Sequence, residues 1–234
     1  MKKQLWAILF SLAPALATAG ELGGKITLEA SRRVGNVSVT NAVVFYRPDD
    51  PTHMTPLAEY REDGSMVEPE VTDAPIEMMM EMKAFNPLVL NVDVGTEINF
   101  PNADRVIHNA FSTTRGSEFD LGFYPQGEER SRVFDTAGLV TVFCNVHQDM
   151  VGYVMVMDTP YHTRPDADGN FTIDNIPEGT GRLFVWHPRG RTFTKLVQVE
   201  STPTELAATL RLTKRLVPNH KNKFGKPYRR SRDY

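Results

Sequence analysis

The chain has 234 residues, of which 41% are hydrophobic and 24% are charged, and its formal net charge is −3. This length suits two small β domains, and the slightly negative charge argues against a general affinity for nucleic acid. The single cysteine, Cys144, excludes an internal disulfide. We find no Ser/His/Asp nucleophile pattern, no paired catalytic carboxylates and no phosphate-binding glycine loop, and we therefore expect no enzymatic activity.

The N-terminus predicts export. Two lysines precede the apolar run LWAILFSLAPALA, and an A-x-A pattern ends at Ala19, so residues 1–19 are predicted to form a signal peptide. This run is too short to span a bilayer, and no later stretch is long and apolar enough to do so. We expect a periplasmic protein that does not span the membrane. Metal ligation is the simplest reason for a single thiol in an oxidising compartment.

Most of the remaining chain consists of short, β-branched-rich segments separated by Gly, Pro, Asn and Asp, which predicts an all-β fold. The polar, Pro-rich residues 49–75 indicate a connecting loop, and residues 201–210 fit either a strand or one short turn of helix. The expected strands are 24–30, 36–46, 87–94, 97–102, 139–146, 152–158, 169–174, 181–188, 193–200 and 209–216.

The segment FCNVHQDMVGYV holds the candidate metal ligands Cys144, His147 and Met150, and His108 lies upstream in FPNADRVIHNAFS. A thiolate, an imidazole and a thioether on one short loop suit copper better than zinc. Two histidines and one thiolate, with a weak axial methionine, make up the blue-copper electron-transfer site. Taken singly, a buried cysteine packs as a small apolar residue, but the four residues together favour a metal site.

These motifs resemble the cupredoxins of the plastocyanin and pseudoazurin group, and also exported cupredoxins described as methylamine-utilisation proteins. The resemblance covers about residues 76–158 and includes MEMKAFNPLVLNVDVGTEINFPNAD, a His-Asn pair at 108–109, FDTAGLVTVFCNVH and MVGYVMV. It implies a Greek-key β-sandwich that carries single electrons between redox protein partners. It also implies one type 1 copper ion bound by His108, Cys144 and His147, with Met150 as the candidate axial ligand.

The ligand loop differs from the family pattern in one respect. Plastocyanin-like proteins place two more residues between the histidine and the methionine, which leaves the distance from Met150 to the copper open. A binuclear copper centre has a similarly short spacing, but it needs a second loop cysteine where this chain has Gln148. The binuclear alternative is therefore rejected.

A second resemblance begins after Asp158. The segment YHTRPDADGNFTIDNIPEGTGRLFVWHPRG is similar to the carboxypeptidase-regulatory-like, transthyretin-like β-sandwich, and residues 24–50 fit the front half of that family. We therefore expect a split sandwich, residues 20–75 and 159–213, into which a cupredoxin domain of residues 76–158 is inserted. In the alternative arrangement, residues 24–48 supply outer strands of the cupredoxin.

The dense run of Met78, Met79, Met80 and Met82 bears on a rival function, because thioethers bind Cu(I). A periplasmic copper-binding or copper-delivery protein would use such a run. The favoured interpretation is that Met78, Met80 and Met82 share one face of a strand and pack the core. A third possibility is a partner-binding β-sandwich module with incidental copper.

The C-terminal residues 214–234 form a basic tail with eight Lys or Arg and a single Asp. Such a tail either docks an acidic partner or a membrane surface, or forms a solvated end. In both cases we expect it to lie away from the ligand segments.

Overall fold

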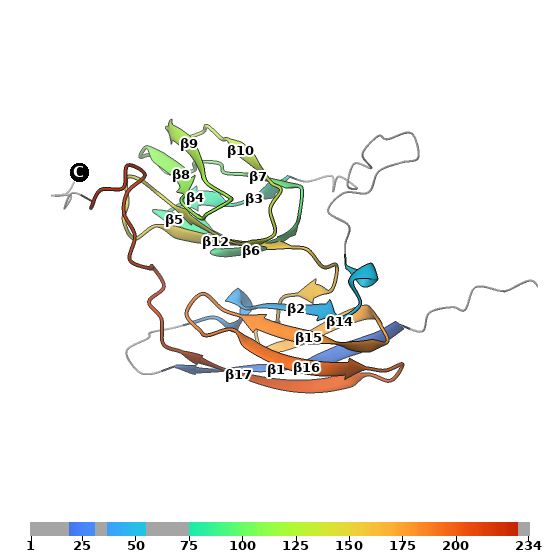
Figure 1. The fold of residues 1–234 in the computed structure, drawn as a ribbon. Coiled ribbons are helices and arrows are strands. Elements are labelled where there is room, and N and C mark those ends of the chain that lie inside the picture. Colours follow the sequence, from blue (N-terminus) through green and yellow to red (C-terminus); the bar gives the residue numbers. More distant parts are fainter. Residues whose placement is uncertain (1–18, 31–36, 55–74, 229–234) are drawn as a thin grey trace, which may run out of the picture.

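The structure is a computed structural model that describes residues 19–30, 37–54 and 75–228 (Figure 1). In this part of the chain the regular structure is β strand apart from two short 3₁₀ turns, η1 (Val39–Asn41) and η2 (Pro51–His53), so the predicted all-β fold is confirmed. Residues 1–18, most of the predicted signal peptide, and residues 55–74 of the predicted loop lie outside the described residues.

One group of strands, here called the terminal sandwich, comes from both ends of the described chain. Its sheets have the orders β14-β1-β17 and β13-β2-β15-β16, and β1 pairs in parallel with β17 although the two are far apart in sequence. Residues 201–210 contribute to a strand and not to a helix. The strands are β1 (Ala19–Ala30), β2 (Val43–Pro48), β13 (His162–Thr163), β14 (Asn170–Pro177), β15 (Gly179–Trp186), β16 (Phe193–Val199) and β17 (Thr204–Leu212).

The strands between them in sequence form a second unit, here called the central sandwich, above the terminal sandwich in Figure 1. Its sheets have the orders β6-β12-β11-β8-β9 and β10-β7-β3, with a β4–β5 hairpin beside them. The strands are β3 (Ile76–Glu77), β4 (Met79–Glu81), β5 (Ala84–Asn86), β6 (Val89–Asp93), β7 (Thr96–Asn99), β8 (His108–Ser112), β9 (Phe119–Tyr124), β10 (Ser131–Phe134), β11 (Gly138–Phe143) and β12 (Val151–Met157).

Strand β12 is buried on both faces, and this explains why MVGYVMV is almost continuously hydrophobic. Val154 and Val156 face the core between the sheets of the central sandwich. Tyr153, Met155 and their neighbours on the other face join a hydrophobic cluster that contains Val43 of β2 and Trp186 of β15. The two sandwiches therefore share an apolar interface, and β12 lies at its centre. The transthyretin-like type of the terminal sandwich and the domain boundaries stay predictions.

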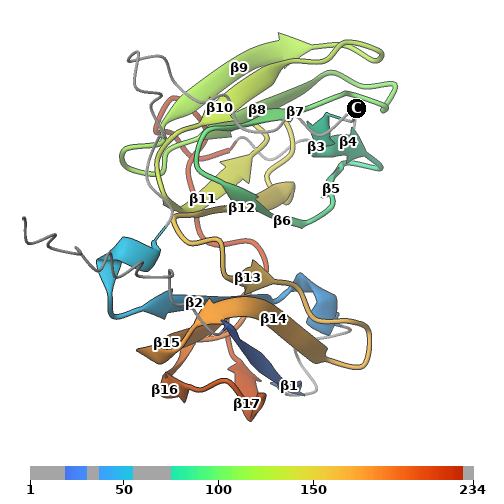
Figure 2. The same cartoon turned by 90° about the vertical axis from the view of Figure 1, so that its right-hand side faces the viewer.

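The described part of the basic tail contradicts the prediction of a solvated end. Residues 214–228 leave β17 and run along the central sandwich toward the end that carries the predicted ligands (Figures 1 and 2). Leu216 and Val217 pack against the interface cluster, and the Tyr153 hydroxyl donates a hydrogen bond to the Leu216 carbonyl. The His220 ring stacks on Phe143, with ring centroids 4.0 Å apart. Apolar and aromatic contacts thus hold this segment despite its charge.

The side chain of His187 is buried, and its Nδ1 accepts a hydrogen bond from the Arg189 N–H at 3.1 Å. The pH dependence of the free energy of unfolding therefore tests whether His187 is buried as the fold requires. Burial lowers the pKa of His187 to about 4, and the Arg189 charge acts in the same direction. The unfolded chain, with an ordinary histidine pKa near 6.5, binds a proton at pH 5 that the folded protein does not.

The contribution of His187 to the free energy of unfolding is therefore complete above about pH 6.5 and decreases as the pH falls toward 4. We expect that, between pH 7 and 5, wild-type protein loses on the order of 1–2 kcal/mol more stability than His187→Gln. Urea unfolding of both proteins at the two pH values measures this difference. An equal loss of stability in the two proteins would contradict the burial of His187 as a neutral imidazole.

Candidate metal centre

The topology brings the predicted ligands to one end of the central sandwich. His108 is the first residue of β8, and Cys144 follows the last residue of β11. These strands are antiparallel neighbours, with Phe111 opposite Phe143, so the beginning of β8 lies beside the end of β11. His147 and Met150 lie in the turn that leads from β11 into β12. The sheet therefore brings together residues that are 36 positions apart.

Three donor atoms form a compact triangle. The Nδ1 atoms of His108 and His147 lie 3.7 and 3.8 Å from the Sγ of Cys144, and 3.1 Å from each other. A point equidistant from three atoms at these separations lies about 2 Å from each, which is the length of bonds from a metal ion to imidazole and thiolate. The donors are thus arranged for one metal ion in a trigonal plane.

Met150 closes the ligand loop through its main chain. Its N–H donates to the His147 carbonyl at 3.2 Å, and its carbonyl accepts from the Cys144 N–H at 3.3 Å. The Met150 side chain is fully buried, in the same apolar cluster as Cys144. The main chain of Met150 thus closes the ligand loop, and an axial bond from its thioether to the metal stays a prediction.

The Asp104 carboxylate contacts the His108 ring nitrogen that is not part of the donor triangle. The Nε2 of His108 lies 2.8 Å from Asp104, which also accepts hydrogen bonds from the backbone N–H groups of Met82 and Lys83, both at 2.8 Å. Burial opposes ionisation of Asp104, but these hydrogen bonds outweigh it and lower the pKa of its carboxyl. An ionised Asp104 accepts a hydrogen bond from the Nε2–H of His108, which leaves the lone pair of Nδ1 free to bind a metal.

Asn109 links the two ligand segments. Its amide donates to Asp120 at 2.7 Å and to the Gly122 carbonyl at 2.8 Å. Its Oδ1 accepts a hydrogen bond from the Asn145 N–H at 3.3 Å. Because Asn109 and Asn145 each follow a candidate ligand in sequence, this contact fixes β8 against the ligand loop.

The electrostatics of the site suit metal binding. Burial raises the pKa of the Cys144 thiol, while backbone N–H groups of His147, Asn109 and Val146 that face the sulfur act in the opposite direction. The thiol is thus protonated at neutral pH in the metal-free protein, and a bound metal displaces that proton. Burial and the nearby His108 lower the pKa of His147, so its imidazole is neutral and able to act as a ligand.

The structure separates the methionines of the 78–82 run. Met78 and Met80 are fully buried in the core, as the favoured interpretation predicted. For Met82 that prediction is wrong, since its side chain is 86% exposed. Met82 and Lys83 form the turn between β4 and β5 with φ values of 53° and 56°, which ends the strand alternation one residue before Met82.

Some solved structures are similar to part of this chain. No protein-family model matches the chain, and no curated protein matches it. Similar solved structures include a reduced Cu(I) form of an amicyanin mutant at pH 4, with 23% identity over 37% of this chain and 86% of the other and a TM-score of 0.34. Another reduced amicyanin mutant has 20% identity over 44% of this chain and 95% of the other, with a TM-score of 0.34.

A purple cupredoxin from Nitrosopumilus maritimus has 25% identity over 35% of this chain and 98% of its own, with a TM-score of 0.32. These scores are too low to support the chemistry of the site, which follows from the donor atoms themselves. His108 and Cys144 are buried and His147 is partly buried, and this cluster, with Met150 in the same loop, is typical of a type 1 copper site.

Asp104 gives a test of the site. Asp104→Asn removes the negative charge behind His108, so it should weaken Cu(II) binding by about tenfold and raise the reduction potential, because a negative charge favours Cu(II) over Cu(I). Competition titration and voltammetry measure the two effects. Asp93→Asn is the matched control, since Asp93 lies 3.1 Å from the Nε2 of His162, a histidine outside the cluster. Equal behaviour of both variants would contradict the role of Asp104.

Proposed function

We propose that this protein is an exported cupredoxin that uses one type 1 copper ion to carry single electrons between redox proteins of the periplasm. The observation that carries the proposal is the triangle of two imidazole nitrogens and one thiol sulfur in a largely buried site. Export is inferred from the sequence of residues 1–19. In the described residues, no helix has the length and apolar character required to cross a membrane.

The chemistry that copper supplies in such a donor set is a one-electron couple between Cu(I) and Cu(II). The protein keeps the donors in place: Asp104 orients His108, Asn109 fixes the ligand loop, and the main chain of Met150 closes that loop. Cys144 and His108 are fully buried, so water is kept from the thiolate side of the site. A donor set held in this way needs little rearrangement on electron transfer, which favours a carrier.

The exposed edge of the site is the proposed point of electron exchange. His147 is only partly buried, whereas the other three candidate ligands are buried. Exposed apolar side chains immediately precede the two histidines in sequence: Ile107 is 53% exposed and Val146 is 45% exposed. An apolar rim around a partly exposed ligand fits brief contact with a redox partner.

The rival role in copper storage or delivery requires thioethers that copper can reach. Met78 and Met80 are buried in the core, whereas Met79 is partly exposed and Met82 is exposed. With two of its four thioethers out of reach from solvent, the run is a poor store for Cu(I). The buried methionines therefore favour the carrier over the delivery protein.

The first test of the proposed function is copper loading. Wild-type protein titrated with Cu(II) should bind one equivalent, show an intense visible thiolate-to-copper band and give a reversible one-electron couple. Cys144→Ala should lose the band, while His162→Gln should retain it because His162 lies outside the cluster. A band that survives in Cys144→Ala would refute the site. Rapid transfer of copper to a Cu(I) chelator on reduction would support delivery.

Met150→Gln tests the axial ligand separately. If the Met150 thioether binds the copper, replacing it with a harder amide oxygen should favour Cu(II) and lower the reduction potential. Voltammetry of the two copper-loaded proteins measures the shift. An unchanged potential would mean that Met150 makes no functional bond to the copper and serves only to pack the loop.

A further inference from the structure

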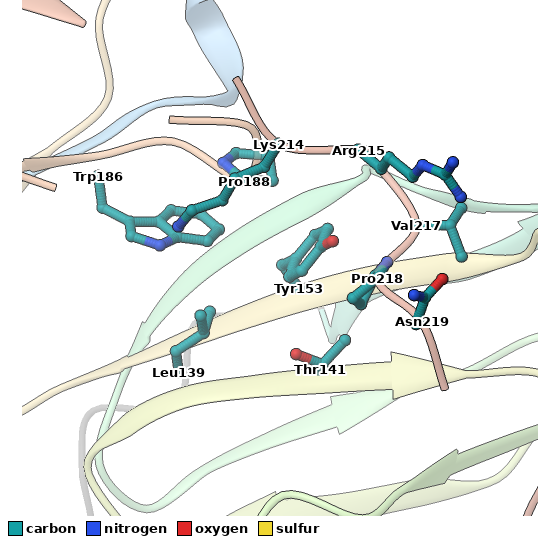
Figure 3. Close-up of a pocket in the computed structure, with 10 residues that line it drawn as sticks. All are labelled: Leu139, Thr141, Tyr153, Trp186, Pro188, Lys214, Arg215, Val217, Pro218 and Asn219. Carbon is teal, nitrogen blue, oxygen red and sulfur yellow. The ribbon is translucent and has the colours of Figure 1, made fainter. Parts of the chain in front are cut away.

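The C-terminal segment 214–228 crosses from the terminal to the central sandwich and reaches the ligand loop. It begins beside a cavity of about 460 Å³ that opens between the sandwiches and is lined by Trp186, Tyr153 and Pro218 together with other residues (Figure 3). Figure 3 shows the Trp186 and Tyr153 rings beside the first residues of the segment. Further on, the stacking of His220 on Phe143 brings the segment to the end of β11.

The end of the segment contacts the peptide group that follows the candidate thiolate ligand. The hydroxyl of Tyr228 donates to the carbonyl of Cys144 at 2.9 Å. The N–H of the same peptide group belongs to Asn145 and donates to Asn109 at 3.3 Å. This peptide plane is therefore held from both sides, and its orientation sets the direction in which the chain leaves Cys144 toward His147.

Two further contacts support this arrangement. The backbone N–H of Lys223 donates to the side chain of Asn145 at 3.0 Å. The ammonium group of Lys223 lies 2.7 Å from Asp120, the carboxylate that accepts a hydrogen bond from Asn109. The Nζ also lies 4.4 Å from the centre of the Phe123 ring, and the Lys223 side chain is only 12% exposed. Lys223 is thus built into the site, unlike the exposed Lys221 of the same segment.

Tyr228 is itself held in place. The Nε2 of His220 lies 3.2 Å from the Tyr228 hydroxyl oxygen, and the two rings are 5.1 Å apart in an edge-on arrangement. The donor that reaches Cys144 is thereby fixed in position.

We infer that the C-terminal segment is part of the copper centre, with Tyr228 and Lys223 as positioning residues for the Cys144–Asn145 peptide. The inference rests on the proposed function for the identity of the metal, while the contacts that carry it belong to the protein alone. It corrects the sequence-based prediction that the tail lies away from the ligand segments.

The test uses the full chain carrying Tyr228→Phe, which keeps the ring and removes the hydrogen bond to Cys144. In the metal-free protein, the Cys144 thiol should react with a disulfide reagent about fivefold faster, the factor expected when one ordinary hydrogen bond stops opposing local opening. In the copper-loaded protein, the visible band should shift and the reduction potential should change. Lys221→Ala is the matched control and should leave all three measurements at wild-type values.

Lys223→Met provides a second variant, since it removes the ion pair with Asp120 and keeps the backbone N–H. It should also make the thiol reaction faster, and the band and the reduction potential should differ from the wild-type values. Wild-type values of all three quantities in both variants would overturn the inference. A faster thiol reaction with an unchanged band and potential would also overturn it, because the segment would then cover the thiol without positioning it. If the wild-type protein forms no copper band, the proposed function fails, and the thiol rates still decide whether the segment holds the loop.

Discussion

The burial of the β11–β12 strand pair is the constraint on which the rest of the structure depends. One face of β12 completes the core of the central sandwich, and the other face packs against β2 and β15 of the terminal sandwich. A strand buried on both faces has few alternative registers, because a slip of one residue would exchange its two sets of side chains. The turn between β11 and β12 carries three of the four candidate ligands, so this register also determines where the donor atoms lie.

The copper centre in turn depends on polar groups that are far apart in sequence. Asp104 is hydrogen-bonded to His108, and Tyr228 donates a hydrogen bond to the carbonyl of Cys144. Asn109 joins Asp120 to the ligand loop through hydrogen bonds. These hydrogen bonds are partly buried, and they are strong only when each member is satisfied, because an unpaired polar group away from water is costly. A rigid donor set is therefore a property of the whole network, and loss of one member is expected to loosen its neighbours.

The sequence singled out three residues that the fold brings into one cluster, His108, Cys144 and His147, and predicted most of the strands. The spacing of Cys144, His147 and Met150 is local, so they lie in one short loop, and the apolar, β-branched-rich segments on either side indicated β11 and β12. The predicted strands did not include β5, β8, β9, β10 or β13. Of these, β8 buries the polar residues His108 and Asn109 through hydrogen bonds and β9 is interrupted by a glycine, so neither has an apolar strand pattern. The exposure of Met82 depends on a turn with positive φ that periodicity does not reveal.

The position of the tail could not be predicted for a different physical reason. Tyr228 is 84 residues from Cys144, and a hydrogen bond over that distance leaves no periodic pattern in the chain. Charge alone left a docking tail and a solvated end as alternatives, but aromatic stacking on Phe143 and apolar contacts of Leu216 and Val217 hold the segment against its own protein. Since the segment begins at the end of β17, both sandwiches are attached to the ligand loop, one through β12 and the other through the segment. The terminal sandwich thus contributes to the stiffness of a site that it does not itself contain.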